Sequence, residues 1–284
     1  MKKLLFIIIT SICYSNLSYQ SLLLPYSTYD LISGYSEYSI SNSILFNELA
    51  KREVSASLII LPQDIQMSSI SYISNPMDYY NNFTMSIIDY GDFIDSESNI
   101  SFNAQDIILR NHLTKKINNI FYGSIGMHYI NSHIANYTSS ALSMEPSLLI
   151  NYKNFLFKGS INNYGIVINH YTDYNESLPH YYSLSLMCIP RYLNSNLLIQ
   201  HHIFTDFDIT NIFGELFVKD HYSLTMSYTS LAKKLYSEDF SSNFFTGFSI
   251  GFNIKYFDYT FNIGIKNLGS IGLMNAITLK KSFN

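Results

Sequence analysis

Hydrophobic and polar residues alternate along the last part of the chain. From Phe244 to Tyr256 every second residue is apolar or aromatic apart from Thr246, and the intervening residues are mostly Gly, Ser and Asn. After a turn at 257–258 the same pattern runs from 259 to 268. A period of two predicts β-strands, here a hairpin with one apolar face and one small, polar face. Because the polar face carries so little charge, we expect these strands to belong to a membrane β-barrel rather than a soluble sandwich.

The alternation recurs upstream, with short turns rich in Asn, Asp, Ser and Gly between the segments. We predict strands over 54–61, 66–73, 83–87, 105–113, 120–129, 141–150, 155–161, 164–169, 181–189, 196–204, 212–218, 222–228, 244–256, 259–268 and 275–283. A membrane strand with its turn takes about 18–20 residues, and bacterial barrels have even strand numbers. The sequence therefore predicts an all-β fold, a transmembrane antiparallel barrel of about 14 strands.

Composition favours the same fold. Only 13% of residues are charged and 16% are aromatic, whereas soluble domains carry about 25% charged residues. No run beyond the N-terminus approaches the ~20 apolar residues of a spanning helix, which leaves a barrel as the way to satisfy the backbone in lipid. The net charge of −4 and the lack of a basic block argue against nucleic acid as a partner. Tyrosines at predicted strand ends are typical of an interfacial girdle: Tyr72, Tyr129, Tyr164, Tyr182, Tyr222, Tyr256 and Tyr259.

The two ends of the chain indicate export. Lys2 and Lys3 precede an apolar stretch over 4–12 and small residues near Ser15, which predicts a cleaved signal peptide over 1–15. Residues 16–53 alternate poorly and form an N-terminal segment that could plug the barrel or contain a short helix over 43–52. The barrel itself is expected over 54–284. Phe283 closes the last predicted strand, a feature that favours the bacterial outer membrane.

One motif suggests catalysis. Gly247–Gly251 reads G-F-S-I-G and fits a nucleophile elbow. That elbow requires a strand-to-helix turn, whereas Ser249 lies in unbroken alternation, so we expect a strand. No catalytic residue and no enzyme activity are predicted.

Histidines and acids raise the question of a metal site. His201, His202, Asp206 and Asp208 have suitable side chains. Adjacent residues of a strand point to opposite faces, so the two histidines cannot chelate one ion. The other histidines show no paired spacing: His112, His128, His133, His170, His180 and His221. We predict no metal and no cofactor.

Glu215 is a candidate polar residue of the lumen. It shares a face with Phe213 and Phe217, while the opposite face is apolar and suits lipid. An unpaired charge in lipid costs about 2–4 kcal/mol at mid-depth. We therefore expect Glu215 to point inward and to pair with a lumen base, Lys255 or Lys266.

Several phrases of the barrel region, over roughly 54–284, resemble one family of bacterial outer-membrane proteins. They are Ser71-Tyr72 with 88–93 (IDYGDF), 102–106 (FNAQD), 126–130 (GMHYI) followed by 137–141 (YTSSA), 163–165 (NYG) followed by 176–179 (ESLP), and 201–202 with 206–208. The pattern resembles the PorV/PorQ family, FadL-like barrels associated with type IX secretion.

The resemblance implies a non-enzymatic scaffold in outer-membrane lipid that acts in secretion or surface attachment. Its partners would be other secretion-system proteins and exported cargo proteins, bound through loops around 169–180, 192–196 and 232–243. The alternatives are a FadL-like channel for hydrophobic small molecules, a purely structural barrel and a soluble exported sandwich. A channel of that kind needs an apolar lumen, whereas the inward faces look small and polar.

Overall fold

The computed structural model describes residues 19–34, 52–75, 79–94, 101–171, 176–219, 221–234 and 245–283. The predicted signal peptide lies outside these residues, as do positions 43–51 of the predicted helix; Arg52 is the first residue of a strand. Within the described residues, no helix is both long and apolar enough to cross a membrane.

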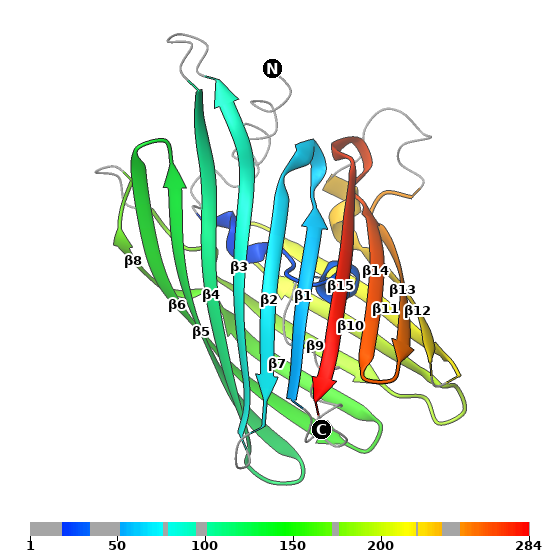
Figure 1. Ribbon diagram of the computed structural model, residues 1–284. Helices are drawn as coiled ribbons and strands as arrows, with labels where there is room; N and C mark the ends of the chain where they lie inside the picture. Colours follow the sequence, from blue (N-terminus) through cyan, green and yellow to red (C-terminus); the bar gives the residue numbers. More distant parts are fainter. Residues whose placement is uncertain are drawn as a thin grey trace.

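Strands make up most of the described chain (Figure 1). They are β1 (Arg52–Ile60), β2 (Gln66–Ser74), β3 (Tyr79–Ile94), β4 (Ser101–Lys116), β5 (Phe121–Ile134), β6 (Tyr137–Tyr152), β7 (Phe155–Asn162), β8 (Tyr164–Asn169), β9 (Tyr181–Cys188), β10 (Ser195–Ile203), β11 (Asp208–Val218), β12 (Tyr222–Thr229), β13 (Phe248–Tyr256), β14 (Tyr259–Asn267) and β15 (Leu273–Phe283). The helical segments are η1 (Gln20–Leu23), α2 (Thr28–Ser33), η2 (Pro62–Asp64), η3 (Ser230–Lys234) and η4 (Gly269–Ile271).

The strands close into a ring by antiparallel pairing of sequence neighbours. β1 pairs with β15, and β5 pairs with β6 along its whole length, so the ring of strands closes. β6 is long enough to pair with β7 through its second half and with β8 through its first half. Since β8 continues the line of β7, the ring is a closed 14-stranded barrel, as the sequence predicts.

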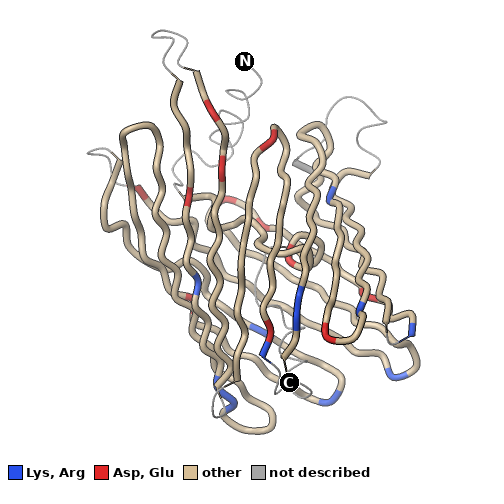
Figure 2. Tube along the Cα trace, in the orientation of Figure 1, with Lys and Arg blue, Asp and Glu red and all other residues tan. Residues whose placement is uncertain are grey.

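The two faces of the wall differ as the alternation predicts. Ile250, Phe252, Ile263 and Ile277 are exposed on the outside, while their chain neighbours point inward and are buried or half-buried. All the tyrosines predicted to form the girdle are exposed. Figure 2 shows how few charged residues the wall carries. An apolar outer surface with few charges is the surface that lipid requires.

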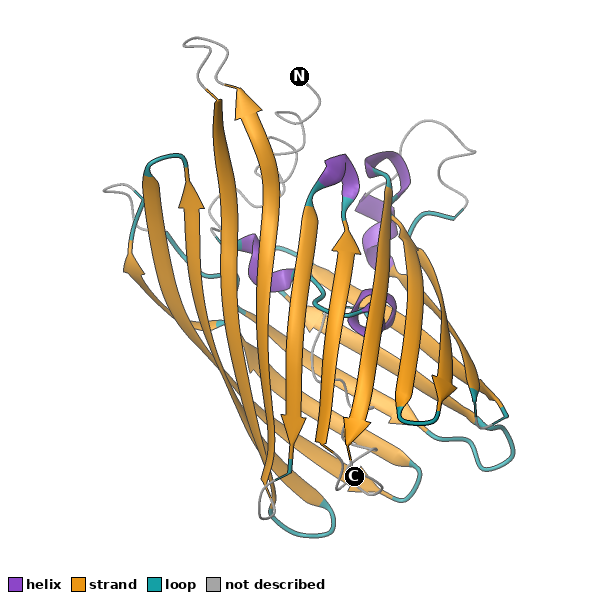
Figure 3. Ribbon diagram, viewed as in Figure 1, coloured by secondary structure: helices purple, strands orange, loops and turns teal. Residues whose placement is uncertain are grey.

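The barrel has one end with tight turns and one end with longer connections. β6 and β7 join through Lys153-Asn154, and β13 and β14 through Phe257-Asp258. At the other end lie η2, η3, η4 and the connection from β8 to β9 (Figure 3). Outer-membrane barrels place short turns toward the periplasm and longer loops outside. The C-terminal strand β15 ends at the same end of the barrel as the tight turns (Figure 1).

β13 begins four residues later than predicted, at Phe248. Gly247 has a φ of +83°, and a Cβ there would lie 2.6 Å from the Cβ of Ala232 and 2.8 Å from the carbonyl oxygen of Thr229. Glycine tolerates this positive φ and these close contacts, but the conformation is not that of a β-strand. The chain turns here instead of extending the strand toward 244.

Candidate functional site

The N-terminal segment 19–34 lies inside the ring of strands (Figure 3). Ser27 caps α2 by accepting a hydrogen bond from the backbone N–H of Asp30 at 3.2 Å. The helix then lies against β11 to β15 on the lumen side. Leu31 and Ile32 are almost fully buried. So short a helix is marginal by itself in water, and the packing against the wall holds it.

Hydroxyl groups fix the helix to the wall. The backbone N–H of Thr28 donates to Oγ1 of Thr278 at 2.9 Å, and the two threonine hydroxyls lie 2.9 Å apart. Ser57 on β1 contacts the same Thr278 hydroxyl at 2.8 Å. Thr278 is fully buried. Thr278 thus accepts a hydrogen bond from the first turn of α2. Through Thr278 and Ser57, the helix is joined to β15 and β1.

The segment also links three apolar clusters that the described residues form in the lumen. Tyr19, Leu22, Tyr26 and Leu31 belong to the first cluster, Ile32 to the second and Leu23 to the third. The wall contributes to the first cluster Ile59, Leu61, Ile65, Met67, Ile88, Ile108, Ile130, Ala141, Leu178, Met274 and Ala276. It contributes to the second Tyr122, Leu149, Leu156, Met187, Leu198 and Phe213.

The inward faces are therefore small and polar only in part, because large apolar side chains also point inward. Along β1, the inward Ser57 is followed by inward Ile59, and Ile59 is directly paired with Met67 of β2. The hydroxyls of Ser57 and Thr278 lie at the start of α2, whereas Ile59 and Met67 belong to the first apolar cluster. The lumen has apolar regions, and residues 19–34 fill them.

The wall has a break beside the first apolar cluster. β9 pairs with β7, but no pairing joins β9 to β8 in the described part of the chain. The change of direction occurs at Asn163, which has a φ of +53° and whose side-chain amide donates to the carbonyl oxygen of Pro179 at 3.2 Å. Leu178, from the connection after β8, reaches through to the first cluster, and Val167 of β8 packs against it. The apolar part of the lumen thus reaches the break.

A hydrogen-bonded chain of side chains connects the N-terminal segment to the connection after β8. The hydroxyls of Tyr19 and Ser139 are hydrogen-bonded, and Ser139 donates to Oε2 of Glu176 at 3.0 Å. Oε1 of Glu176 accepts from the backbone N–H of Tyr171 at 3.1 Å. The Tyr171 hydroxyl donates to Ser132. Burial raises the pKa of Tyr171 to about 12, so this hydroxyl stays protonated at neutral pH.

The predicted lumen residues occupy different positions. Glu215 points inward and is buried, and its carboxylate accepts from Ser223 at 2.8 Å and from the amides of Asn196 and Asn253 at 3.5 and 3.4 Å. Its hydrogen-bond partners are thus neutral groups rather than the expected lysine. Lys266 is also inward and buried, whereas Lys255 is exposed at the end of β13.

The other residues weighed for chemistry are parts of strands. Ser249 lies in β13, paired with Ser227 and Lys266. His201 and His202 lie on opposite faces of β10, with His201 beside Thr210 at 3.0 Å and His202 buried. No elbow is formed at Ser249, and the two histidines diverge as expected.

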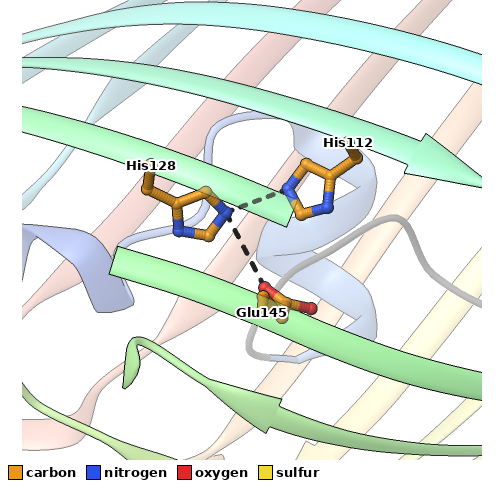
Figure 4. A group of neighbouring side chains, drawn as sticks. All are labelled: His112, His128 and Glu145. Carbon is orange, nitrogen blue, oxygen red and sulfur yellow. Dashed lines mark hydrogen bonds and ion pairs between the residues drawn. The ribbon is translucent and has the colours of Figure 1, made fainter. Parts of the chain in front are cut away.

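The structure brings together three side chains that sequence spacing did not pair. His112 of β4, His128 of β5 and Glu145 of β6 meet on the lumen face (Figure 4). The signal that could have found them is strand register, since His112 and Glu145 both pair with Gly126.

No family model and no curated protein matches this sequence, so the resemblance to the PorV/PorQ family stays a prediction. Solved structures do match. A TodX monoaromatic hydrocarbon channel with a deltaS2S3 mutation has a TM-score of 0.56 at 10% identity, with 91% of this chain and 99% of that chain covered.

The CymD monoaromatic hydrocarbon channel also has a TM-score of 0.56, at 8% identity, with coverage of 92% and 98%. A Pseudomonas aeruginosa FadL homologue has a TM-score of 0.52 at 9% identity, with coverage of 92% and 99%. The chain therefore folds as a FadL-like, 14-stranded barrel of the bacterial outer membrane.

Proposed function

We propose that this barrel is a channel for hydrophobic small molecules. The observation that carries the proposal is the meeting of an apolar lumen region with a break in the wall. Leu178 and Val167 belong to both, because they pack in the first apolar cluster and flank the gap between β8 and β9. A porin for polar solutes needs a continuous wet lumen and no such apolar path.

The break faces lipid on the outside. Tyr164, Ile166 and Ile168 of β8 are more than half exposed on the outer surface. A small apolar solute that entered from the loop end would lose contact with water in the first cluster and would then reach the hydrocarbon through the gap. Each step buries apolar surface, at about 25 cal/mol per Å². The route thus needs no energy source beyond the hydrophobic effect.

Residues 19–34 fill the apolar regions, so transport requires them to move. Their attachment consists of a few hydroxyl hydrogen bonds and apolar contacts, which are individually weak. A solute that takes the place of Leu22 or Leu31 recovers much of the lost apolar contact. The N-terminal segment is therefore the gate in this proposal.

The structural neighbours support the same function. Two of the three compared above are described as monoaromatic hydrocarbon channels. Their identity to this chain is 10% or less, so they support the class of solute, a small apolar molecule, and not a particular one. The secretion role, with secretion-system proteins and exported cargo as partners, rests on the family resemblance alone.

The two functions predict opposite results in a strain that lacks this gene. The channel predicts slower uptake of a radiolabelled monoaromatic hydrocarbon and an unchanged set of surface proteins. The secretion role predicts normal uptake and the loss of particular proteins from the surface. Expression of the wild-type chain should restore whichever property was lost, and normal uptake in the deletion strain would overturn the channel proposal.

A further inference from the structure

Three metal-ligating side chains converge on neighbouring strands (Figure 4). Nε2 of His112 lies 3.1 Å from Nε2 of His128, and the latter lies 3.8 Å from Oε2 of Glu145. One ligand atom from each residue lies within 4.8 Å of the other two. All three residues are buried. Such a group of two imidazoles and a carboxylate is a set that zinc uses in proteins.

Gly126 makes the convergence possible. His112 and Glu145 pair with it from either side, so their backbones are two strand spacings apart, about 9–10 Å. A Cβ on Gly126 would lie 2.6 Å from Cε1 of His112 and 3.1 Å from Cβ of Glu145. Because Gly126 has no Cβ, the imidazole of His112 and the carboxylate of Glu145 can lean over β5. His128, two residues further along β5, points to the same face.

We propose that His112, His128 and Glu145 form a binding site for a divalent transition metal ion, with Zn²⁺ as the best fit. A tetrahedral zinc ion with bonds of 2.0–2.2 Å separates its ligand atoms by about 3.3 Å. The two measured separations, 3.1 and 3.8 Å, fall on either side of that value. The separation between the ligand atoms of His112 and Glu145 is within 4.8 Å, so side-chain rotation that draws these two residues together would complete the site and leave a fourth position for water.

The carboxylate is already oriented for this role. Nζ of Lys158 lies 3.7 Å from Oε1 of Glu145, whereas Oε2 is the oxygen that faces His128. Lys158 therefore holds one oxygen and leaves the other to the ion. Outer groups of this kind commonly orient ligating carboxylates. Hard cations such as Mg²⁺ prefer oxygen ligands alone and should not compete.

The site lies where the barrel wall branches. β6 pairs with β8 up to Met144 and with β7 from Ser147, so Glu145 and Pro146 occupy the junction. An ion held by His112, His128 and Glu145 would cross-link β4, β5 and β6 at that point. This inference does not depend on what the barrel transports.

The test uses the full chain, purified without a polyhistidine tag and folded in detergent. Titration with Co²⁺ should give the visible absorption bands of a four-coordinate ion and saturate at about one equivalent. Zn²⁺ should abolish the bands, and excess Mg²⁺ should leave them unchanged. The absence of saturable Co²⁺ and Zn²⁺ binding by the wild-type barrel would overturn the proposal.

Variants locate the site. His112→Gln and His128→Gln should each lower Zn²⁺ affinity by at least about 100-fold, and Gly126→Ala by about 10- to 100-fold through displacement of His112. His201→Gln is the matched histidine control. Gly159→Ala is the matched glycine control, because its Cβ would make an ordinary 3.7 Å contact with Leu184. Both should bind like wild type.

A measurement on the wild-type protein covers the case in which the variants fail to fold. The zinc X-ray absorption spectrum should show two imidazole ligands and light-atom neighbours at about 2.0–2.1 Å. A spectrum without imidazole ligands, or unchanged affinity in folded His112→Gln and His128→Gln, would contradict the assignment.

Discussion

A Cβ atom at Gly264 would lie 2.6 Å from Cδ1 of Ile32, so the wall and the lumen helix meet where the wall has no side chain. Gly251 on the neighbouring strand is paired with Gly264 and faces the same Ile32 atom. The pair of glycines forms a flat place on β13 and β14 into which Ile32 fits. The small residues on the inner face of this hairpin thus position the N-terminal segment.

Gly264→Ala should release the N-terminal segment. The added methyl overlaps Ile32 and Thr28, and overpacking of this kind costs about 1–3 kcal/mol. A cost of about 1–2 kcal/mol should raise the population of the detached segment by about 5- to 30-fold. Chymotrypsin cleavage at Tyr26 and Tyr29 measures it.

The control for this experiment is Gly214→Ala, whose Cβ would make an ordinary contact 3.6 Å from Cδ2 of Leu197 on the outer face. It should be cleaved no faster than wild type. Equal cleavage of Gly264→Ala and wild type would contradict the seating of Ile32 on the glycine pair.

Thr278→Val should weaken the same attachment by a different route. It removes the oxygen that accepts from the Thr28 backbone N–H, and an unsatisfied buried donor costs about 1–3 kcal/mol. Thr225→Val is the matched control, because the buried Thr225 hydroxyl has no hydrogen-bond partner among the described residues. Thermal unfolding in detergent should show a lower transition temperature for Thr278→Val only; a similar loss in both variants would argue against the hydrogen bond.

Gly165→Ala should loosen β8, the strand that borders the break in the wall. A Cβ at Gly165 would overlap the carbonyl oxygen of Leu142 and lie 2.6 Å from Cα of Ser143, so β8 must separate from β6. Solute flux should rise if the break is the exit. Gly159→Ala, on β7, is the control with an ordinary contact. Flux that stays the same or falls in a folded Gly165→Ala barrel would place the exit elsewhere.

Ile263→Arg tests the lipid-facing side. Ile263 lies mid-strand on the exposed face of β14, where an arginine should cost about 2–4 kcal/mol of folding free energy in lipid. Tyr256→Arg, next to the β13–β14 turn, should cost about 0–1 kcal/mol. Lys281 illustrates the tolerated position, since its ammonium lies 5.3 Å from the Tyr259 ring and 5.2 Å from the Phe283 ring. Denaturant titration in vesicles measures the difference, and equal costs would contradict the assigned depth.

Local alternation predicted the strands because the period of two is visible within each segment. Phe252 and Ile263 could be placed outside, and Gly251 and Gly264 inside, without knowledge of any distant residue. The boundary at Phe248 was missed because the positive φ of Gly247 responds to Ala232 and Thr229, which belong to another part of the chain.

The packing of segment 19–34 and the cluster of His112, His128 and Glu145 both depend on contacts between distant parts of the chain, which the sequence does not display. Ile32 meets Gly264 across more than two hundred residues, and nothing in the segment 19–34 indicates which face of the wall it will meet. His112 and His128 are brought together by the register of β4 against β5, which the turn at 117–120 sets. Spacing along the chain therefore gave no sign of the metal cluster or of the apolar clusters in the lumen.

The most direct test of the channel is solute flux through the purified barrel. Vesicles with and without the reconstituted protein are exposed to a small apolar fluorophore whose emission rises in the bilayer, behind an outer polysaccharide layer that slows its direct entry. We expect faster entry with the barrel, faster still with Gly264→Ala, and no effect on the entry of a sugar of similar size. Equal entry of the fluorophore with and without the barrel would contradict the proposed function.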